Sequence, residues 1–492
     1  MAVQSDTQPQ QAHDEPVTTG IYIGGGAREG TDHLEVREPA DPSVVIGRAA
    51  AASRQDAEDA VAAAKEAFPA WSALTPQQRA EQINAAISGL EAHRDADARI
   101  LARENGKILP EASVDLLVFN IRTELATALA DEVDATHELP GPPVTTTVGY
   151  QPLGVVTIIV PFNWPVAILG ASLPHALMAG NTVIVKPPPT TPLATTRVVQ
   201  RVAEQLPPGV LNVVTGRDAD MSPLIQSPDV AKVCFTGSVR GGSKIMELAA
   251  PSLTRVTLEL GGNDPAIILE DAVLDEAALD RLFAGIFDTT GQICMAAKRL
   301  YVHRSRYQEV VDALTERLSR TVLGHALAEG TTMGPLHQSA QKEFVEELVA
   351  EAKQAGAEVR EFGELPADYP DGNFVRPSLV LDPPRDLRVV TEEQFGPTIP
   401  VMPFDSEEEA VAAANDTWAG LCGSVWTADA EAANRVGGQL VCGFVFVNDH
   451  GATRLDLRAP FGGMKGSGIG REQGIEGIRD FQDTRSIGHL AV

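Results

Sequence analysis

The feature that most constrains the fold is a series of short apolar stretches, between residues 155 and 235, that alternate with helix-like segments. Almost wholly apolar stretches are typical of strands buried on both faces of a sheet. The strands are predicted at 155–160, 182–185, 210–214 and 230–235, and the helices at 165–178 and 195–205. Alternation at this spacing indicates βαβ units, a parallel sheet and a doubly wound α/β domain, which binds ligands at the carboxyl ends of its strands.

The same pattern returns further along, so a second α/β domain is expected to begin near Glu259 and to contain Cys294. Its first strands are predicted at 266–269 and 300–302, and its first helices at 276–289 and 305–323. Helices are also predicted over 53–101, with a start at Thr75-Pro76, and over 112–130; an isolated strand is predicted at 144–148, and loops at 363–397 and 460–470.

The charge balance excludes several classes of partner. The chain has 39 basic and 67 acidic residues, a net charge of −28, which disfavours nucleic acid and anionic membranes. It has no apolar run near the roughly 20 residues of a membrane span. Because the start is polar and lacks the pattern of a signal peptide, we expect a cytoplasmic protein with a disordered tail over 1–17.

Cys294 and Glu259 are the residues best suited to covalent chemistry. Cys294 follows Gly291-Gln292 and precedes two cations, and Glu259 lies in an apolar, glycine-closed turn. A soft nucleophile and a carboxylate made basic by apolar neighbours are the parts of acyl chemistry followed by hydrolysis. The other cysteines (Cys234, Cys422 and Cys442) lie in apolar stretches and are predicted to be buried, and no spacing of Cys and His indicates a metal site.

Three loops that follow predicted strands hold candidate binding residues, each with a structural alternative. The Asn163 amide could donate to an oxyanion or form an Asx turn. Lys186 could bind a ribose or phosphate, or be a solvated loop lysine. The stretch from Phe235 to Lys244 could bring glycines to a pyrophosphate or simply start a helix, and it fits neither the Rossmann nor the Walker A pattern.

Taken together, these motifs resemble the aldehyde dehydrogenase superfamily from about Tyr22 to Ile487, and they occur in the order of that family. The resemblance implies a Rossmann-like NAD(P)-binding domain (18–127 and 149–258), a catalytic domain (259–475) and a small β oligomerisation arm (128–148 and 476–492). It implies that Cys294 attacks an aldehyde, that Asn163 and the Cys294 backbone N–H hold the oxyanion, and that Glu259 activates the water that hydrolyses the thioester. An acid at Glu259 favours a free carboxylic acid over transfer to coenzyme A.

The resemblance also implies the cofactor site, with Lys186 at the adenine ribose and Glu393 and Phe395 at the nicotinamide. The full set of implied cofactor residues is Pro161, Phe162, Trp164, Lys186, Pro189, Gly216, Phe235, Thr236, Gly237, Ser238, Gly242, Leu260, Gly261, Glu393 and Phe395. The chain departs from the family at Pro189, where NAD-preferring members often carry a ribose-binding Glu, and at Arg240, where an acid is common. We therefore expect NAD with substantial tolerance of NADP.

The substrate funnel is implied by the same resemblance. Its residues are Trp164, Ile168, Ala171, Ile293, Met295 and Leu455. Ala171 is small where an aromatic is common, which favours a wide apolar funnel for aromatic or medium-chain aldehydes, and no arginine pair for a dicarboxylic semialdehyde is evident. The alternatives are a dehydrogenase that acylates coenzyme A, a non-catalytic homologue and a cysteine hydrolase. The family usually forms homodimers or homotetramers.

Overall fold

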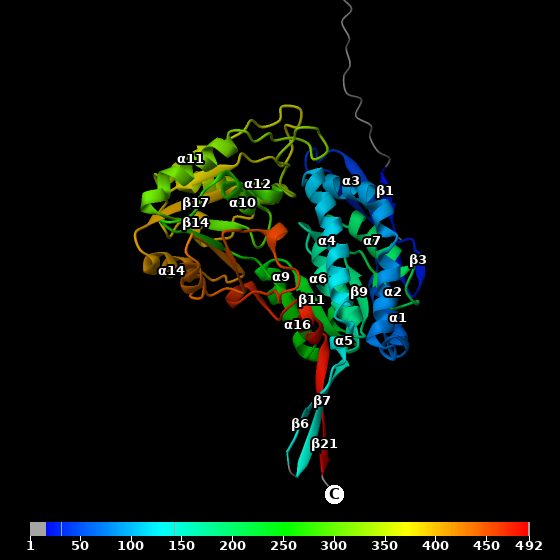
Figure 1. The fold of residues 1–492 in the computed structure, drawn as a ribbon. Coiled ribbons are helices and arrows are strands. Elements are labelled where there is room, and N and C mark those ends of the chain that lie inside the picture. The colour runs from blue at the N-terminus through cyan, green and yellow to red at the C-terminus, as the bar shows by residue number, and fades with distance from the viewer. Residues whose placement is uncertain (1–15, 31, 142, 491–492) are drawn as a thin grey trace, which may run out of the picture.

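The computed structural model describes residues 16–30, 32–141 and 143–490, which form two α/β lobes and a protruding arm (Figure 1). The lobe with α1 to α7 lies on the right of the view, the lobe with α10 to α14 on the left, and the arm points downward. None of the helices in this part of the chain is long and apolar enough to cross a membrane.

The first lobe contains an eight-stranded sheet in the order β20-β12-β11-β8-β9-β10-β2-β3. Its strands are β2 (Ile21–Ile23), β3 (Gly26–Arg28), β8 (Val155–Ile159), β9 (Thr182–Lys186), β10 (Leu211–Val213), β11 (Val230–Thr236), β12 (Arg255–Glu259) and β20 (Gly468–Ile469). The five strands from β12 to β10 are parallel. Their carboxyl ends therefore meet at one edge of the sheet, where the loops after β8, β9, β11 and β12 begin.

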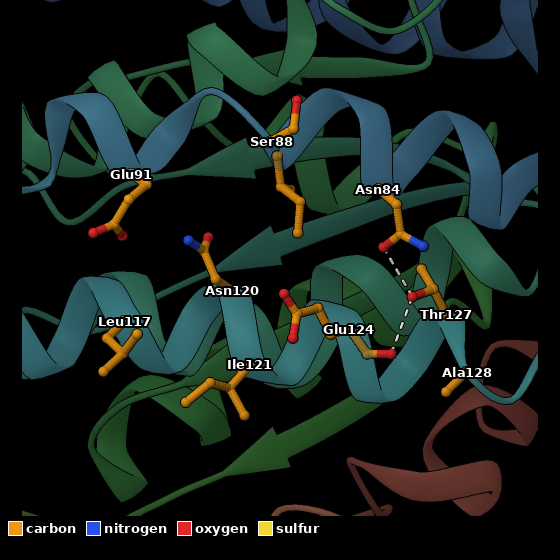
Figure 2. Close-up of a pocket in the computed structure, with 10 residues that line it drawn as sticks. Asn84, Ser88, Glu91, Leu117, Asn120, Ile121, Glu124, Thr127 and Ala128 are labelled. Atoms are coloured by element: carbon orange, nitrogen blue, oxygen red, sulfur yellow. Dashed lines mark hydrogen bonds between the residues drawn. The ribbon is translucent and has the colours of Figure 1, made fainter.

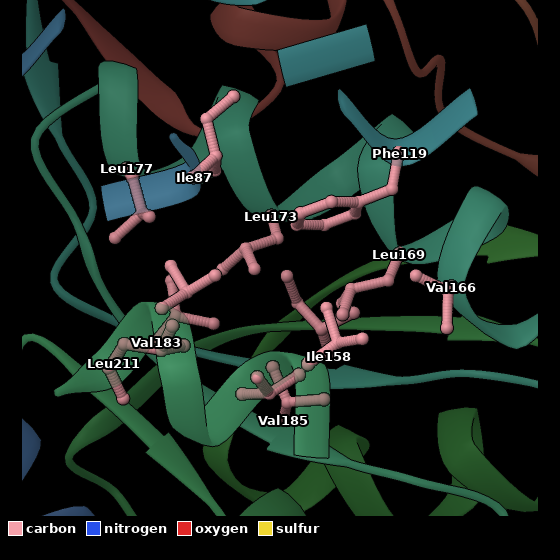
Figure 3. Close-up of a cluster of buried hydrophobic side chains, with 14 of the residues drawn as sticks. Ile87, Phe119, Ile158, Val166, Leu169, Leu173, Leu177, Val183, Val185 and Leu211 are labelled. Carbon is pink, nitrogen blue, oxygen red and sulfur yellow. The ribbon is translucent and has the colours of Figure 1, made fainter. Parts of the chain in front are cut away.

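Alternate residues of these strands enter two hydrophobic cores on opposite faces of the sheet, as the pleat requires. Ile158 and Val185 pack with Leu169 and Phe119 in the core drawn in Figure 3, whereas Ile159 belongs to the core of the other face. The helices of this lobe are α1 (Arg54–Ser72), α2 (Pro76–Ile87), α3 (Arg94–Asn105), α4 (Leu109–Thr127), α5 (Ala130–Val133), α6 (Pro165–Met178), α7 (Leu193–Ala203), α8 (Pro223–Gln226) and α9 (Val239–Ala249).

The second lobe contains a seven-stranded sheet in the order β15-β16-β17-β14-β13-β18-β19, parallel except for β15. Its strands are β13 (Asp264–Ile268), β14 (Ala297–His303), β15 (Glu358–Glu361), β16 (Ser378–Leu381), β17 (Thr398–Phe404), β18 (Cys422–Trp426) and β19 (Phe444–Val447). Its helices are α10 (Glu276–Phe287), α11 (Tyr307–Leu318), α12 (Ser339–Gln354), α13 (Arg388–Thr391), α14 (Glu407–Asn415) and α15 (Ala430–Gly437).

Two three-stranded sheets complete the fold. One joins β1 (Val17–Thr19), β5 (Val45–Ala51) and β4 (Asp32–Arg37). The other is the arm, in which β7 (Val144–Pro152) pairs with β6 (His137–Leu139) and β21 (Gln482–Leu490); the short helix α16 (Gly474–Arg479) leads into β21. The prediction of a strand outside the main sheet at 144–148 is confirmed.

The predicted strands and helices of both α/β regions are confirmed, with shifts of a few residues at their ends. Two loop predictions were incomplete, because 363–397 contains β16 and α13, and 460–470 contains β20, which pairs with β12 of the first sheet. Of the disordered tail predicted over residues 1–17, residues 1–15 lie outside the described part of the chain. Val17 is ordered, because it belongs to β1 and pairs with Gly47 of β5. The division into a cofactor domain, a catalytic domain and an arm stays a prediction.

Candidate active site

Cys294 lies just after a strained turn at the end of α10. Thr289, Thr290 and Gly291 have φ angles of 53°, 57° and 73°, a conformation that costs a non-glycine residue about 1–3 kcal/mol. A β-carbon on Gly291 would lie 2.3 Å from the Gly396 carbonyl oxygen, so only glycine fits there. The position of the thiol is thus set by a backbone that the surrounding structure must hold in place.

Contacts from both lobes hold this turn. The Glu111 carboxylate accepts the Thr289 backbone N–H at 2.6 Å, and the Trp164 indole donates to the Thr289 hydroxyl at 3.0 Å. The Thr290 hydroxyl donates to the Gly334 carbonyl at 3.0 Å. Burial raises the pKa of Glu111 to about 7. Nothing in the sequence motif singled out Glu111, because a glutamate in the first turn of a helix is ordinary.

Lys298 orients the backbone of the thiol loop. Its ammonium donates to the carbonyls of Ile293 at 2.7 Å and Cys294 at 2.6 Å, and it lies 3.5 Å from the Glu393 carboxylate. In a trans peptide the N–H points opposite to the carbonyl. The Cys294 N–H, which shares a peptide with the Ile293 carbonyl, therefore points away from Lys298, and the described residues provide no acceptor for it.

Asn163 lies beside this loop, between β8 and α6, and is 3% exposed. Its side-chain nitrogen donates to the Gln292 carbonyl at 2.8 Å, and the Asn105 amide supports the same loop through the Phe162 carbonyl at 2.7 Å. The Asx-turn alternative is not observed, because Trp164 is the N-cap of α6 and makes no side-chain cap. The structure thus brings Asn163 to the residue two before Cys294, with its second amide hydrogen available.

Glu259 ends β12 and is 5% exposed. Burial, and next the neighbouring Glu472, raise its pKa well above the usual value. Neither carboxylate oxygen has a hydrogen-bond partner among the described residues; the Gly463 backbone N–H opposes the rise in pKa but is not in hydrogen-bonding geometry. A buried carboxyl with free lone pairs is suited to accept a proton from water.

The Cys294 thiol is held in its neutral form. Burial raises its pKa to about 12, Lys298 lowers it, and the carboxyls of Glu393, Asp264 and Glu259 raise it. Attack by this sulfur therefore requires a base to remove the proton. The other three cysteines are free and buried, as the sequence predicted. Among the described residues no cluster of metal-ligating side chains occurs.

The turn between β11 and α9 fits a cofactor pyrophosphate. Ser238 caps α9 by accepting the Gly241 N–H at 3.1 Å, and the described residues leave the N–H groups of Val239 and Arg240 without acceptors. β-Carbons on Gly237 and Gly242 would lie 2.6 and 2.7 Å from the side chains of Phe235 and Leu260. Free N–H groups at a helix start behind a glycine-tight turn form an anion site.

Lys186 is 4% exposed, so the alternative of a solvated loop lysine is wrong. Its ammonium lies 2.8 Å from the carboxylate of Asp218, which follows β10 and Gly216 and is 85% exposed. The sequence did not single out Asp218, because an acid in a surface loop carries no signal of its own. A carboxylate therefore reaches this lysine although Pro189 occupies the position of the family's usual acid.

Glu393 and Phe395, the residues predicted at the nicotinamide, lie between the Gly261-Gly262 turn and the Phe162 loop. The Glu393 carboxylate accepts the Gly262 N–H at 3.1 Å, and a β-carbon on Gly261 would lie 2.1 Å from it. Phe395 has a φ of 46° and meets the Phe162 ring edge-on at 5.9 Å. His337, which sequence reasoning missed, stacks on the Phe162 ring with the ring centroids 4.4 Å apart.

The predicted funnel is largely assembled around Cys294. One hydrophobic cluster contains Trp164, Ile168, Ile293, Met295 and Leu455 together with Cys294. Ala171 is buried on α6 but does not belong to that cluster. Val114 and Val118 of α4 also join the cluster, although sequence reasoning did not name them.

A separate cavity of about 640 Å³ lies on the surface between α2 and α4 (Figure 2). Leu117, Ile121 and Glu124 of α4 line it, and it contains none of the predicted site residues. The candidate site therefore lies at the carboxyl ends of the strands of the first sheet, beside the Cys294 loop, and is separate from this cavity.

Comparisons of the sequence and of the structure with known proteins both lead to aldehyde dehydrogenases. The model of the aldehyde dehydrogenase family matches residues 27–487. The peroxisomal aminoaldehyde dehydrogenase 1 of Pisum sativum is 36% identical over 90% of this chain and 90% of its own length. Betaine aldehyde dehydrogenase from Staphylococcus aureus in complex with NAD+ has a TM-score of 0.90 at 32% identity, with 96% and 95% of the chains covered. An NADP-dependent enzyme of E. coli has a TM-score of 0.91 at 33% identity, with 96% and 98% covered.

Proposed function

The chain belongs to the aldehyde dehydrogenase family, and we propose that it oxidises an aldehyde to a free carboxylic acid through a thioester on Cys294. The observation that carries the proposal is the pairing of two groups: a neutral, loop-held thiol and a buried carboxyl without hydrogen-bond partners. The thiol forms the acyl intermediate, and the carboxyl, once ionised, activates the water that hydrolyses it.

The first step is attack of the Cys294 sulfur on the aldehyde carbon. The thiol proton is transferred to solvent water, so that the sulfur attacks as a thiolate, and Glu259 remains ionised for the hydrolysis that follows. The developing oxyanion receives hydrogen bonds from the Cys294 N–H and from the Asn163 side chain. Loss of one such donor typically costs about 10²–10³ in rate.

The turn before α9, Lys186 and Glu393 would hold NAD(P)+ between the lobes. When bound, the cofactor supplies the acceptor for the hydride that leaves the substrate carbon. The thioester that remains on Cys294 is then hydrolysed by water from which Glu259 takes a proton. Since no thiol acceptor is needed, the product is the free acid.

The alternatives predict different products. A dehydrogenase that acylates coenzyme A forms product only when coenzyme A is added, and a non-catalytic homologue forms no NADH with any aldehyde. A cysteine hydrolase would release acid from an ester without NAD(P). Following an aldehyde panel at 340 nm, with and without coenzyme A, tests the proposal; NADH formation that depends on coenzyme A would reject it.

For the cofactor we propose NAD first, with NADP as the alternative. Pro189 removes the usual carboxylate, but Asp218 brings another one to Lys186. A carboxylate near the adenine ribose repels a 2′-phosphate. Dissociation constants of NAD+ and NADP+ from quenching of protein fluorescence test this preference, and tighter binding of NADP+ would reverse it.

For the quaternary structure we propose a homodimer or homotetramer joined through the arm. Leu139, Val144 and Leu490 are exposed apolar residues on its three strands, and the register places them on one face, because Leu139 opposes Thr146 and Val144 opposes Leu490. Such a patch is unusual on a free surface. Light scattering on the whole chain measures the state, and a monomer at micromolar concentration would contradict the proposal. A cytoplasmic location likewise stays a prediction.

A further inference from the structure

We propose that Arg122 on α4 binds an anionic group of the substrate, so that the preferred substrates are aldehydes that also carry a carboxylate. This inference rests on the aldehyde oxidation proposed above. It changes the expectation of a wholly apolar funnel by adding one cation to its wall.

Arg122 lies on the face of α4 that carries two residues of the cluster around Cys294. Val114 and Val118, which pack in the cluster around Cys294, precede it at intervals of four residues. Residues four apart lie on the same face of a helix, so Arg122 extends the stripe that faces the thiol. Leu117 and Ile121 instead line the surface cavity of Figure 2. The guanidinium therefore belongs to the inner side of α4.

Small residues on α6 leave room beside the Arg122 side chain. A β-carbon on Gly170 would lie 3.2 Å from the Arg122 β-carbon and 3.4 Å from its δ-carbon, so the arginine stem lies directly against this glycine. The next residue is Ala171, which is small. The side chain thus runs across α6 toward the funnel residues Trp164 and Ile168 on the same helix.

The Arg122 guanidinium has N–H donors that the described residues do not use. Of its five N–H groups, one on Nη1 donates to the Ala167 carbonyl at 2.6 Å. Nε is buried without a partner, and no ion pair to Arg122 occurs among the described residues. The side chain keeps some accessible surface although burial lowers its pKa, as expected of a residue that lines a cleft. A half-buried cation without an ion pair is costly unless a ligand supplies the anion.

The nearby carboxyls do not fill this role. Asp115 is engaged by Lys107 at 2.8 Å and by the Ala167 N–H at 2.5 Å, and Glu472 accepts the Ser172 hydroxyl at 2.8 Å. Both act on Arg122 only through space, as does Cys294. The cation is therefore near the reacting sulfur and free to pair with a carboxylate at the far end of a substrate.

The experiment compares two aldehydes of equal length, hexanal and 6-oxohexanoate, in the wild type and in Arg122→Met, Arg122→Lys and the control Arg54→Met. Arg54 is exposed on α1 and pairs with Glu58. We expect the wild type to have the higher kcat/KM for 6-oxohexanoate. Arg122→Met should lower that value about 10- to 100-fold, the effect of a charge-assisted hydrogen bond, and change hexanal less than about 3-fold. Arg122→Lys should retain part of the preference.

Binding of adipate, the dicarboxylate analogue, gives a second readout that needs no turnover. Adipate should raise the melting temperature of the wild type and Arg54→Met, and not that of Arg122→Met. If Arg122→Met lowers kcat/KM equally for both aldehydes, Arg122 has only a structural role, in balancing the charge of carboxyls such as Glu472. That result would overturn the proposal. If the wild type oxidises neither aldehyde, the proposed function is rejected. The shift in melting temperature with adipate would then test by itself whether Arg122 binds an anion.

Discussion

The two ends of the proposed cofactor and substrate site are built differently. Around Cys294, the turn and Asn163 are buried and held by short contacts between the lobes, and Glu259 is buried with no hydrogen-bond partner for its carboxylate among the described residues. At the adenosine end, one buried lysine meets an 85% exposed aspartate in a loop. We therefore expect the loss of a buried, desolvated group near Cys294 to be severe, and a change in the solvent-screened pair at the adenosine end to be tolerated.

The largest effect is expected at the thiol. Cys294→Ala removes the nucleophile and should lower kcat at least about 10⁴-fold, because no other described side chain at this point of the site can form the acyl bond. NAD+ binding, measured by fluorescence quenching, should be unchanged. Residual activity within tenfold of the wild type would mean that the chemistry lies elsewhere.

Glu259→Gln comes next and should lower kcat about 10²–10⁴-fold, the range of a lost general base. In the wild type kcat should rise with pH, because Glu259 works only when ionised and burial raises its pKa. The amide variant should lose this rising limb. A pH profile of kcat for both proteins measures it, and an unchanged limb in the variant would assign the titration to another group.

Glu111→Ala tests whether the strained turn must be clamped. Removing the acceptor of the Thr289 N–H should lower kcat/KM about 10- to 100-fold, since an unsatisfied buried N–H costs about 1–3 kcal/mol. Glu124→Ala, on the same helix but at the surface cavity, is the matched control. If Glu111→Ala and Glu124→Ala have the same kcat/KM, the turn does not depend on the hydrogen bond between Glu111 and Thr289.

The smallest effect is expected at the adenosine end. Asp218→Asn should raise the NADP+ to NAD+ ratio of binding constants about 5- to 10-fold, a modest value because the carboxylate is exposed and screened. Asp220→Asn in the same loop is the control. Equal ratios in all three proteins would remove Asp218 from the account of specificity.

The same division explains how much the sequence could predict. Hydrophobic periodicity and continuous apolar runs predicted the bounds of β8, α6 and β9 to within about a residue. The strands could be predicted because a parallel strand that is buried on both faces has a continuous apolar sequence. The pairing of the two-residue strand β20 with β12 was not predictable, because the contact is tertiary and the local sequence is a glycine loop.

Site residues divide in the same way. Cys294, Glu259 and Asn163 were recognisable from motifs, and the structure brings Asn163 to the thiol loop. Arg122, Glu111 and Asp218 were not, because an arginine or glutamate on a helix and an aspartate in a loop are ordinary in sequence. Only packing shows that Arg122 is half-buried with no ion pair among the described residues, that Glu111 contacts Thr289 and that Asp218 contacts Lys186.

The most direct test of the central claim is mass spectrometry of Glu259→Gln after mixing with an aldehyde and NAD+. The account predicts that the protein gains the mass of one acyl group on the peptide that contains Cys294, together with one equivalent of NADH, and that hydroxylamine removes the adduct. Formation of NADH without an acyl group on Cys294, or an adduct on another residue, would contradict it.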